Sequence, residues 1–107
     1  MKLWIDDVRP APSGFTWAKT VSRAKEIIIS NEELLEVNLG KSTYRIELID
    51  IDHDAGDYVA DGGDYIKLLD WLEETGRNYP IRIHSMNVVG RMNMEAICRR
   101  NGWKIVE

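Results

Sequence analysis

Hydrophobic residues along the chain alternate between short continuous runs and longer stripes at helical spacing. The short runs predict β-strands, and their apolar character is typical of the buried strands of a parallel sheet. These runs are Lys2 to Ile5, Phe15 to Lys19, Ile46 to Ile51, Ile81 to His84 and Trp103 to Val106.

Three helices are predicted between these runs. Thr20 is a suitable N-cap for a first helix that ends near Ser30. A second helix ends at Gly76, and a third extends from about Val89 to Arg100 before the stop signal Asn101-Gly102. Their apolar faces consist of Val21, Ala24, Ile27 and Ile28, of Tyr65, Leu68, Leu69 and Leu72, and of Met94, Ile97 and Cys98.

The segment from Asn31 to Arg45 has two interpretations. Glu32 to Leu35 could prolong the first helix, whereas the apolar residues on either side of Gly40 to Ser42 would suit a β-hairpin. The pattern leaves both open.

Strands that alternate with helices predict right-handed parallel crossovers and an α/β fold. We expect a three-layer sandwich whose sheet of about five strands has the flavodoxin-like order 2-1-3-4-5. The 107 residues are enough for one compact domain, so residues 1–107 are predicted to form a single domain. The four tryptophans fall in predicted strands and helices and are expected to pack in the core.

The composition, with 44% hydrophobic and 30% charged residues, is that of a folded protein. No apolar segment approaches the roughly 20 residues of a membrane span. The acidic pair Asp6-Asp7 also comes too early for a signal peptide. We therefore expect a cytoplasmic protein without a membrane partner.

The net charge of −4 means that the chain lacks the cationic field that attracts long nucleic-acid backbones. Binding to duplex nucleic acid is not expected. An anionic ligand would have to be met locally, by arginines or a metal ion. This favours a small phosphorylated ligand or one strand end, such as an RNA terminus.

Acidic residues and histidines stand at the ends of three predicted strands. These are the segments Asp6-Asp7, Asp52-His53-Asp54 and His84-Ser85. Because ligands of open α/β sheets bind beyond the carboxyl ends of the strands, the three segments are expected to form one site.

Carboxylates on neighbouring strand ends repel each other unless a proton or a cation neutralises them, since strands lie about 4.8 Å apart. Oxygen ligands suit a hard divalent ion, so we predict Mg²⁺ or Mn²⁺. The predicted ligands are Asp6, Asp7, Asp52 and Asp54. The alternative is an acidic loop in solvent, because surface aspartates are common.

His53 and His84 are the only histidines of the chain. Either could transfer a proton near neutral pH, or could be a hydrogen-bonded structural residue. His84 is the preferred general acid or base because Ser85 follows it at the strand end. His53 is the weaker candidate, with a contact to substrate as its possible role.

The segment after the fourth predicted strand offers groups that bind phosphate. Ser85, Asn87 and Arg91 supply a hydroxyl, an amide and a guanidinium beside a helix start, and helix amino-termini favour anions. The alternative is that Asn87 only caps the helix and Arg91 is solvated. Arg9 could bind substrate or form a local ion pair.

Together these motifs resemble the cyclic-phosphate processing receiver-like domain, a shortened relative of response-regulator receiver domains. The resemblance spans nearly the whole chain. It rests on Leu3 to Pro12, on Asp52 to Asp54, and on Arg82 to Ser85 with Asn87, Gly90-Arg91 and Asn93-Met94.

The resemblance implies roles for particular residues. Asp6 and Asp7 match the metal-binding acidic pair of receivers, and Asp52 matches the aspartate that accepts a phosphoryl group. Ser85 matches the hydroxyl residue at the end of the fourth strand. Two features depart from receivers: Trp103 to Val106 stands where receivers have a lysine-proline pair, and no C-terminal helix is expected.

Two functions follow from the residues and the resemblance. The first is a metal-assisted phosphoesterase or phosphotransferase that acts on a cyclic phosphate, on an RNA end or a small nucleotide, in RNA repair or conflict systems. Asp52 would be nucleophile or metal ligand, and His84 the general acid or base. The alternative is a receiver-like module without turnover that accepts phosphate on Asp52 or binds a nucleotide.

Overall fold

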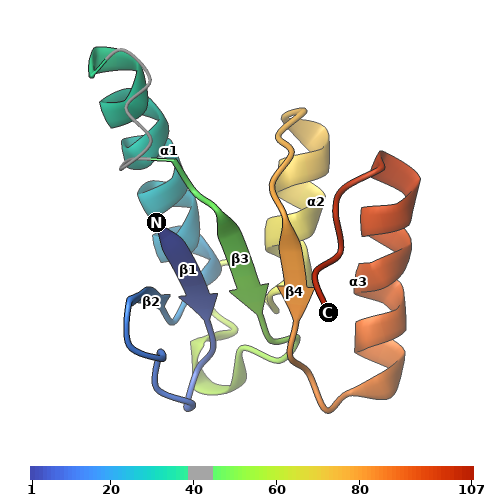
Figure 1. The fold of residues 1–107 in the computed structure, drawn as a ribbon. Coiled ribbons are helices and arrows are strands. Elements are labelled where there is room, and N and C mark those ends of the chain that lie inside the picture. Colours follow the sequence, from blue (N-terminus) through green and yellow to red (C-terminus); the bar gives the residue numbers. More distant parts are fainter. Residues whose placement is uncertain (39–44) are drawn as a thin grey trace.

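The computed structural model describes residues 1–38 and 45–107. Strands and helices follow one another along the chain as the sequence predicts (Figure 1). In order, they are β1 (Lys2–Ile5), β2 (Phe15–Ala18), α1 (Val21–Val37), β3 (Leu48–Ile51), the short 3-10 helix η2 (Gly56–Tyr58), α2 (Ile66–Glu74), β4 (Ile81–Ile83) and α3 (Val88–Asn101).

The strands form one parallel sheet with the order β2-β1-β3-β4. This confirms the α/β fold class and the receiver-like strand order. In the register of the sheet, Trp4 of β1 lies beside Trp17 of β2 and Asp50 of β3, and Asp50 lies beside Arg82 of β4. Side chains at these paired positions point to the same face of the sheet.

Within residues 1–38 and 45–107, the sheet has four strands rather than the expected five. Of the predicted strand Trp103 to Val106, only Ile105 forms a bridge, with Ile81 of β4. The reason is that the amide of Trp103 donates to the carbonyl of Cys98 and so closes the end of α3 instead of joining a strand. As expected, no helix follows this segment in the described part of the chain.

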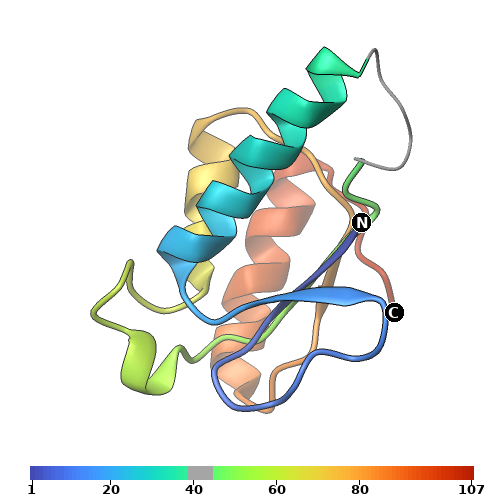
Figure 2. The same ribbon diagram turned by 90° about the vertical axis from the view of Figure 1, so that its left-hand side faces the viewer.

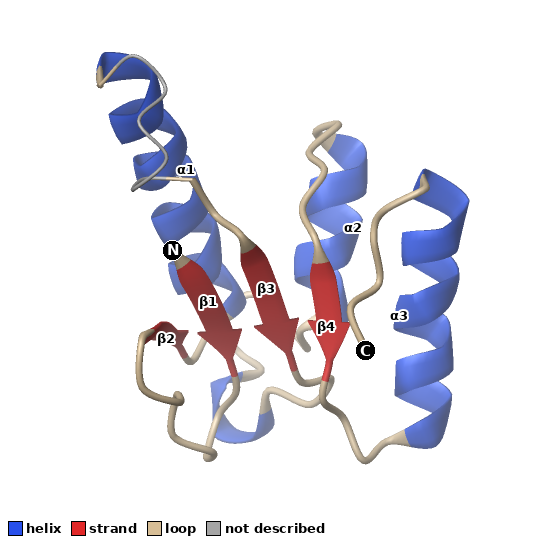
Figure 3. Cartoon of the chain, viewed as in Figure 1, coloured by secondary structure: helices blue, strands red, loops and turns tan. Residues whose placement is uncertain are grey.

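All three α-helices pack against one face of the sheet, so the described elements make two layers rather than the expected three (Figure 2; Figure 3). The direction of the crossovers explains this. The crossovers from β2 to β3, from β3 to β4 and from β4 to Ile105 all move across the sheet in the same direction. Right-handed connections then place all three helices on one face. Only the link from β1 to β2 runs the other way, and it is a loop.

The hydrophobic core lies between the sheet and the helices. It includes Leu3, Ile5, Ile49, Ile51, Ile81 and Ile83 from the strands. The opposite face, which we call the open face, carries Trp4, Trp17, Asp50 and Arg82. The core position expected for the tryptophans therefore holds for Trp103 and, at the edge, for Trp71, but not for the two on the open face.

Helix α1 is longer than predicted and continues to Val37, which settles part of the ambiguous segment in favour of a helix. Its extension is fixed by Glu32, which accepts hydrogen bonds from the Arg77 guanidinium at 2.9–3.1 Å and from the Tyr79 hydroxyl at 2.6 Å. The hairpin alternative centred on Gly40 to Ser42, which lie outside the described residues.

Capping residues mark the helix ends as predicted. The Thr20 hydroxyl accepts from the amide of Arg23, and Gly102 ends α3 in the left-handed conformation with φ +68°. Within residues 1–38 and 45–107, the helices are too short or too polar to cross a membrane.

Candidate metal and phosphate site

Three carboxylates converge where β1 and β3 end, those of Asp6, Asp7 and Asp52. Ile5 and Ile51 are paired neighbours in the sheet, and the amide of Asp52 donates to the carbonyl of Ile5 at 2.9 Å. The next residues along the two strands, Asp6 and Asp52, are thereby brought together with Asp7. One potential ligand atom from each of these three aspartates lies within 4.8 Å of the others.

Asp6 is the buried member of this carboxylate group, with 0% of its surface exposed. Its Oδ1 accepts hydrogen bonds from the amides of Val8 at 3.0 Å and Arg9 at 2.9 Å, and its Oδ2 contacts His84 Nε2 at 2.9 Å. Burial alone would raise the pKa of Asp6, but these hydrogen bonds outweigh it and lower the pKa. Asp6 is therefore a fixed anion at the base of the group.

Asp7 has the opposite electrostatic character. Burial raises its pKa, and the neighbouring Asp6 raises it further. The ionised form of Asp7 is therefore disfavoured in the folded protein. The loop comes close to Asp7 at Gly56, where φ is +55° and where a Cβ atom would overlap the carboxylate of Asp7. Glycine permits both this conformation and this approach.

The three carboxylates offer oxygen ligands at one point, which fits a hard divalent ion. A cation there would also offset the unfavourable negative charge of ionised Asp7. Each carboxylate oxygen has two lone pairs, so the hydrogen bonds to Asp6 leave room for a ligand bond. Asp52 accepts from the amide of His53 through Oδ1, and its Oδ2 has no partner among the described residues.

Asp54, the fourth predicted ligand, lies outside this group. Its side chain is 60% exposed, and its Oδ1 lies 2.8 Å from Nδ1 of His53. Alternation along an extended strand would place Asp54 on the same side as Asp52, but the chain bends at His53 and Asp54 pairs with the His53 ring instead.

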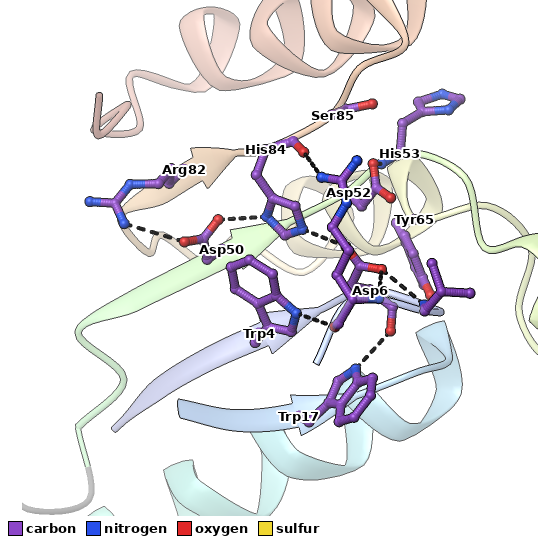
Figure 4. Close-up of polar contacts among 12 residues, drawn as sticks. Trp4, Asp6, Trp17, Asp50, Asp52, His53, Tyr65, Arg82, His84 and Ser85 are labelled. Carbon is purple, nitrogen blue, oxygen red and sulfur yellow. Dashed lines mark hydrogen bonds and ion pairs between the residues drawn. The ribbon is translucent and has the colours of Figure 1, made fainter. Parts of the chain in front are cut away.

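His84 lies on the open face and links two buried carboxylates. Its Nδ1 contacts Asp50 at 2.6 Å and its Nε2 contacts Asp6 at 2.9 Å (Figure 4). Burial lowers the pKa of His84, but the hydrogen bonds and charges of the two aspartates outweigh this effect and raise the pKa. Both ring nitrogens can donate only in the imidazolium form, so this arrangement favours a protonated ring.

His53 points away from Asp6 (Figure 4). Its ring packs against Gly90 of α3, where a Cβ atom would lie 2.5 Å from the ring. The side-chain nitrogen Nδ2 of Asn87 also lies 3.4 Å from its Nδ1. These contacts show His53 joining the end of β3 to the first turn of α3.

Ser85 and Asn87 form a local turn at the start of α3. The Ser85 hydroxyl accepts from the amide of Asn87 at 3.1 Å, and Asn87 Oδ1 accepts from the amide of Gly90 at 2.9 Å. Asn87 therefore caps the N-terminus of α3, which was the alternative to a phosphate contact. Ser85 is 7% exposed and follows His84 at the end of β4.

The two predicted substrate-binding arginines lie in different places. Arg9 extends from the loop after β1, and its Nη1 donates to the carbonyl of His84 at 3.0 Å. It therefore bridges the ends of β1 and β4 next to the carboxylates. Arg91, in contrast, is directed to Glu95 on its own helix, with Nε 3.1 Å from Oε1.

The comparison with known protein families decides what kind of domain carries this site. The family model of the cyclic-phosphate processing receiver domain matches residues 1–100. The chain belongs to this family. No curated protein and no solved structure matches the chain. The family description associates this receiver domain with the processing of cyclic phosphates.

Four residues that surround the three carboxylates were not predicted as site residues. They are Asp50, Trp4, Trp17 and Tyr65. The sequence does contain a signal for Asp50: a charged residue in the middle of an apolar strand needs a buried partner. The tryptophans hold the loop that carries Asp6 to Arg9: the indole of Trp4 donates to the carbonyl of Arg9 and that of Trp17 to the carbonyl of Asp6.

Tyr65 is buried beneath the carboxylate group, and its hydroxyl donates to the carbonyl of Lys19 at 2.8 Å. Burial raises its pKa, and the charges of Asp7 and Asp6 raise it further. Tyr65 is therefore a neutral hydrogen-bond donor that packs next to the carboxylate group on its core side.

Proposed function

We propose that this receiver domain opens a cyclic phosphodiester with the help of a divalent ion held by Asp6, Asp7 and Asp52. The observation that carries the proposal is the convergence of the three carboxylates within 4.8 Å at the ends of β1 and β3. Its context is a chain that belongs to a cyclic-phosphate processing family. The substrate would be a small cyclic nucleotide or an RNA terminus, as in RNA repair.

A bound Mg²⁺ or Mn²⁺ would supply a positive charge for the phosphoryl oxygens. The guanidinium of Arg9, held at the carbonyl of His84, would orient the phosphate. Asp52 has one carboxylate oxygen engaged by the amide of His53, which fixes its direction. In hydrolysis, a water oxygen bonds to phosphorus, one ester P–O bond of the ring breaks, and the released alkoxide takes the proton.

For His84 we propose a positioning role in place of general acid or base catalysis. Both of its nitrogens are engaged by carboxylates of this chain, so a proton transfer to substrate would first break the contact with Asp6 or Asp50. As an imidazolium, His84 would hold Asp6 in place and reduce the charge repulsion within the carboxylate group.

The test is incubation of the protein with nucleoside 2′,3′-cyclic phosphates and Mg²⁺ or Mn²⁺. Formation of the phosphate monoester, followed by chromatography, is expected in the parent protein and lost in Asp52→Asn. The matched control is Asp61→Asn, an exposed aspartate of the following loop, which should keep full activity. No product in the parent protein with either metal ion would refute the proposal.

The second candidate function is a module that accepts a phosphoryl group on Asp52 without turnover. The engagement of both His84 nitrogens favours it, because a phosphoacceptor needs no free general base. Incubation with a small acyl phosphate and Mg²⁺ should then give a stable mass increase of one phosphoryl group. Asp52→Asn should abolish this increase, and Asp61→Asn should retain it.

A further inference from the structure

Three arginines line a cavity that shares no residue with the carboxylate site. The cavity has a volume of about 390 Å³ and lies between β4, the segment around Ile105 and α3. Arg82 reaches it from β4, and Arg91 and Arg99 reach it from α3, two helical turns apart. The volume falls within the range of small-molecule sites, roughly 300–1,000 Å³.

Each of the three guanidinium groups is held by one carboxylate. Arg91 Nε lies 3.1 Å and Arg99 Nη2 lies 3.3 Å from the two oxygens of Glu95, which stands between them on α3. Arg82 Nη1 lies 3.3 Å from Asp50. A guanidinium has five N–H donors, so each arginine keeps donors that have no partner among residues 1–38 and 45–107.

The lining of the cavity favours an anion that carries an apolar or aromatic part. The carboxylates of Glu95 and Glu107 lie in the lining, and Asp50 pairs with Arg82, so the three positive charges are matched. An anion would therefore bind through the N–H donors that these ion pairs leave unused. The side chains of Ile83 and Ile105 provide an apolar wall. Guanidinium forks match phosphate oxygens, and an apolar wall can contact a nucleobase.

We propose that this cavity binds the phosphate group of a nucleotide unit, with Arg82, Arg91 and Arg99 as the phosphate ligands. The proposal goes beyond the reaction at the carboxylate site and does not require it. The nucleotide unit could be a free mononucleotide or part of an RNA strand. A strand could reach both places, because Arg82 shares Asp50 with His84, which in turn contacts Asp6.

Calorimetric titration with AMP, in buffer that contains EDTA, tests the cavity without any metal-dependent binding at the carboxylates. AMP should bind the parent protein saturably, and Arg91→Gln and Arg99→Gln should each weaken binding about tenfold, the loss expected for one charge-assisted contact. Their side chains are 50% and 69% exposed, so both variants should fold. Arg23→Gln is the matched control, since Arg23 is an exposed helical arginine paired with Glu26, and should bind AMP as the parent does.

The same titration with ApApA, which has internal phosphodiesters but no terminal phosphate, distinguishes a free mononucleotide from an RNA strand as the ligand. Tighter binding of ApApA than of AMP supports a strand, and tighter binding of AMP supports a free mononucleotide. Failure of both to bind, or equal affinity in the parent and both cavity variants, overturns the proposal. Neither result depends on turnover of a cyclic phosphate.

Discussion

The imidazole ring of His84 lies flat against the indole ring of Trp4, with ring centroids 4.0 Å apart and an angle of 6° between the planes. The edges of the imidazole contact Asp50 on one side and Asp6 on the other. A cation on an indole face is favourable, as is a cation between two carboxylates. The open face of the sheet therefore holds His84 as an imidazolium that reaches the carboxylate site.

The protonated state of His84 predicts a pH dependence of stability. The pKa of His84 is raised in the folded protein above its ordinary value of 6.5. A raised pKa means that the stabilisation from His84 is complete below pH 6.5 and is lost as the pH rises through the folded-state pKa. Urea unfolding from acid to alkaline pH should show this decrease in the free energy of unfolding.

The variant His84→Gln isolates this contribution. It keeps one donor but cannot carry charge, so the free energy of unfolding at about pH 6 should fall by about 2 kcal/mol, the value of hydrogen bonds to charged groups. The difference between His84→Gln and the parent should shrink as the pH rises. A difference that stays constant with pH would show that His84 is neutral in the folded protein.

Asp50→Asn should destabilise the protein by about 3 kcal/mol, because it leaves a buried imidazolium without one of its counter-charges. Asp50 is 3% exposed, so solvent cannot replace the lost charge. The pKa of His84, followed by NMR, should decrease in this variant. Asp70→Asn is the control: it removes an exposed ion pair with Lys67 and should cost less than about 1 kcal/mol.

Helix ends could be predicted from the sequence where a local capping residue sets them. Thr20 and Gly102 act on backbone groups within a few residues, so a single stretch of sequence contains the whole signal. The end of α1 at Val37 could not be predicted in this way. Its last turns are held through Glu32 by Arg77, which lies 45 residues later in the chain.

The same distinction applies to the candidate site. Asp6, Asp7 and Asp52 could be predicted because parallel strands bring their carboxyl ends to one edge of a sheet, whatever their rotamers. Side-chain directions could not be predicted from strand ends alone. Arg91 bonds within its own helix, and His84 reaches over β3 to the carboxylate of Asp6, which directly follows β1.

Asp7→Asn should stabilise the metal-free protein at neutral pH. Burial and Asp6 raise the pKa of Asp7 above 3.8, so its ionisation costs stability as the pH rises through that value. Thermal unfolding in EDTA should give a Tm a few degrees above that of the parent. Addition of Mg²⁺ or Mn²⁺ should then raise the Tm less than in the parent, because one ligand is missing.

Asp57→Asn controls for a general effect of net charge, since Asp57 is exposed in the neighbouring η2. It should leave the metal-induced rise in Tm unchanged. Equal Tm values for Asp7→Asn and the parent in EDTA would mean that the carboxylate group is not under repulsion.

Gly90→Ala should destabilise the protein by about 2 kcal/mol, the usual cost of overpacking. Alanine normally stabilises a helix by up to about 1 kcal/mol relative to glycine. At Gly90, however, the added Cβ would lie 2.5 Å from the ring of His53, which is confined because its Nδ1 donates to Asp54 at 2.8 Å. The contact with His53 therefore reverses the usual sign.

A double-variant cycle with His53→Ala separates steric overlap from helix propensity. Without the imidazole, the Cβ added at this helical position has room, so Gly90→Ala in the His53→Ala background should stabilise the protein by up to about 1 kcal/mol. Urea unfolding of the four proteins measures the coupling energy, which should be about 2–3 kcal/mol. Additive effects would contradict the packing of His53 on α3 and would leave that ring free to reach the carboxylates.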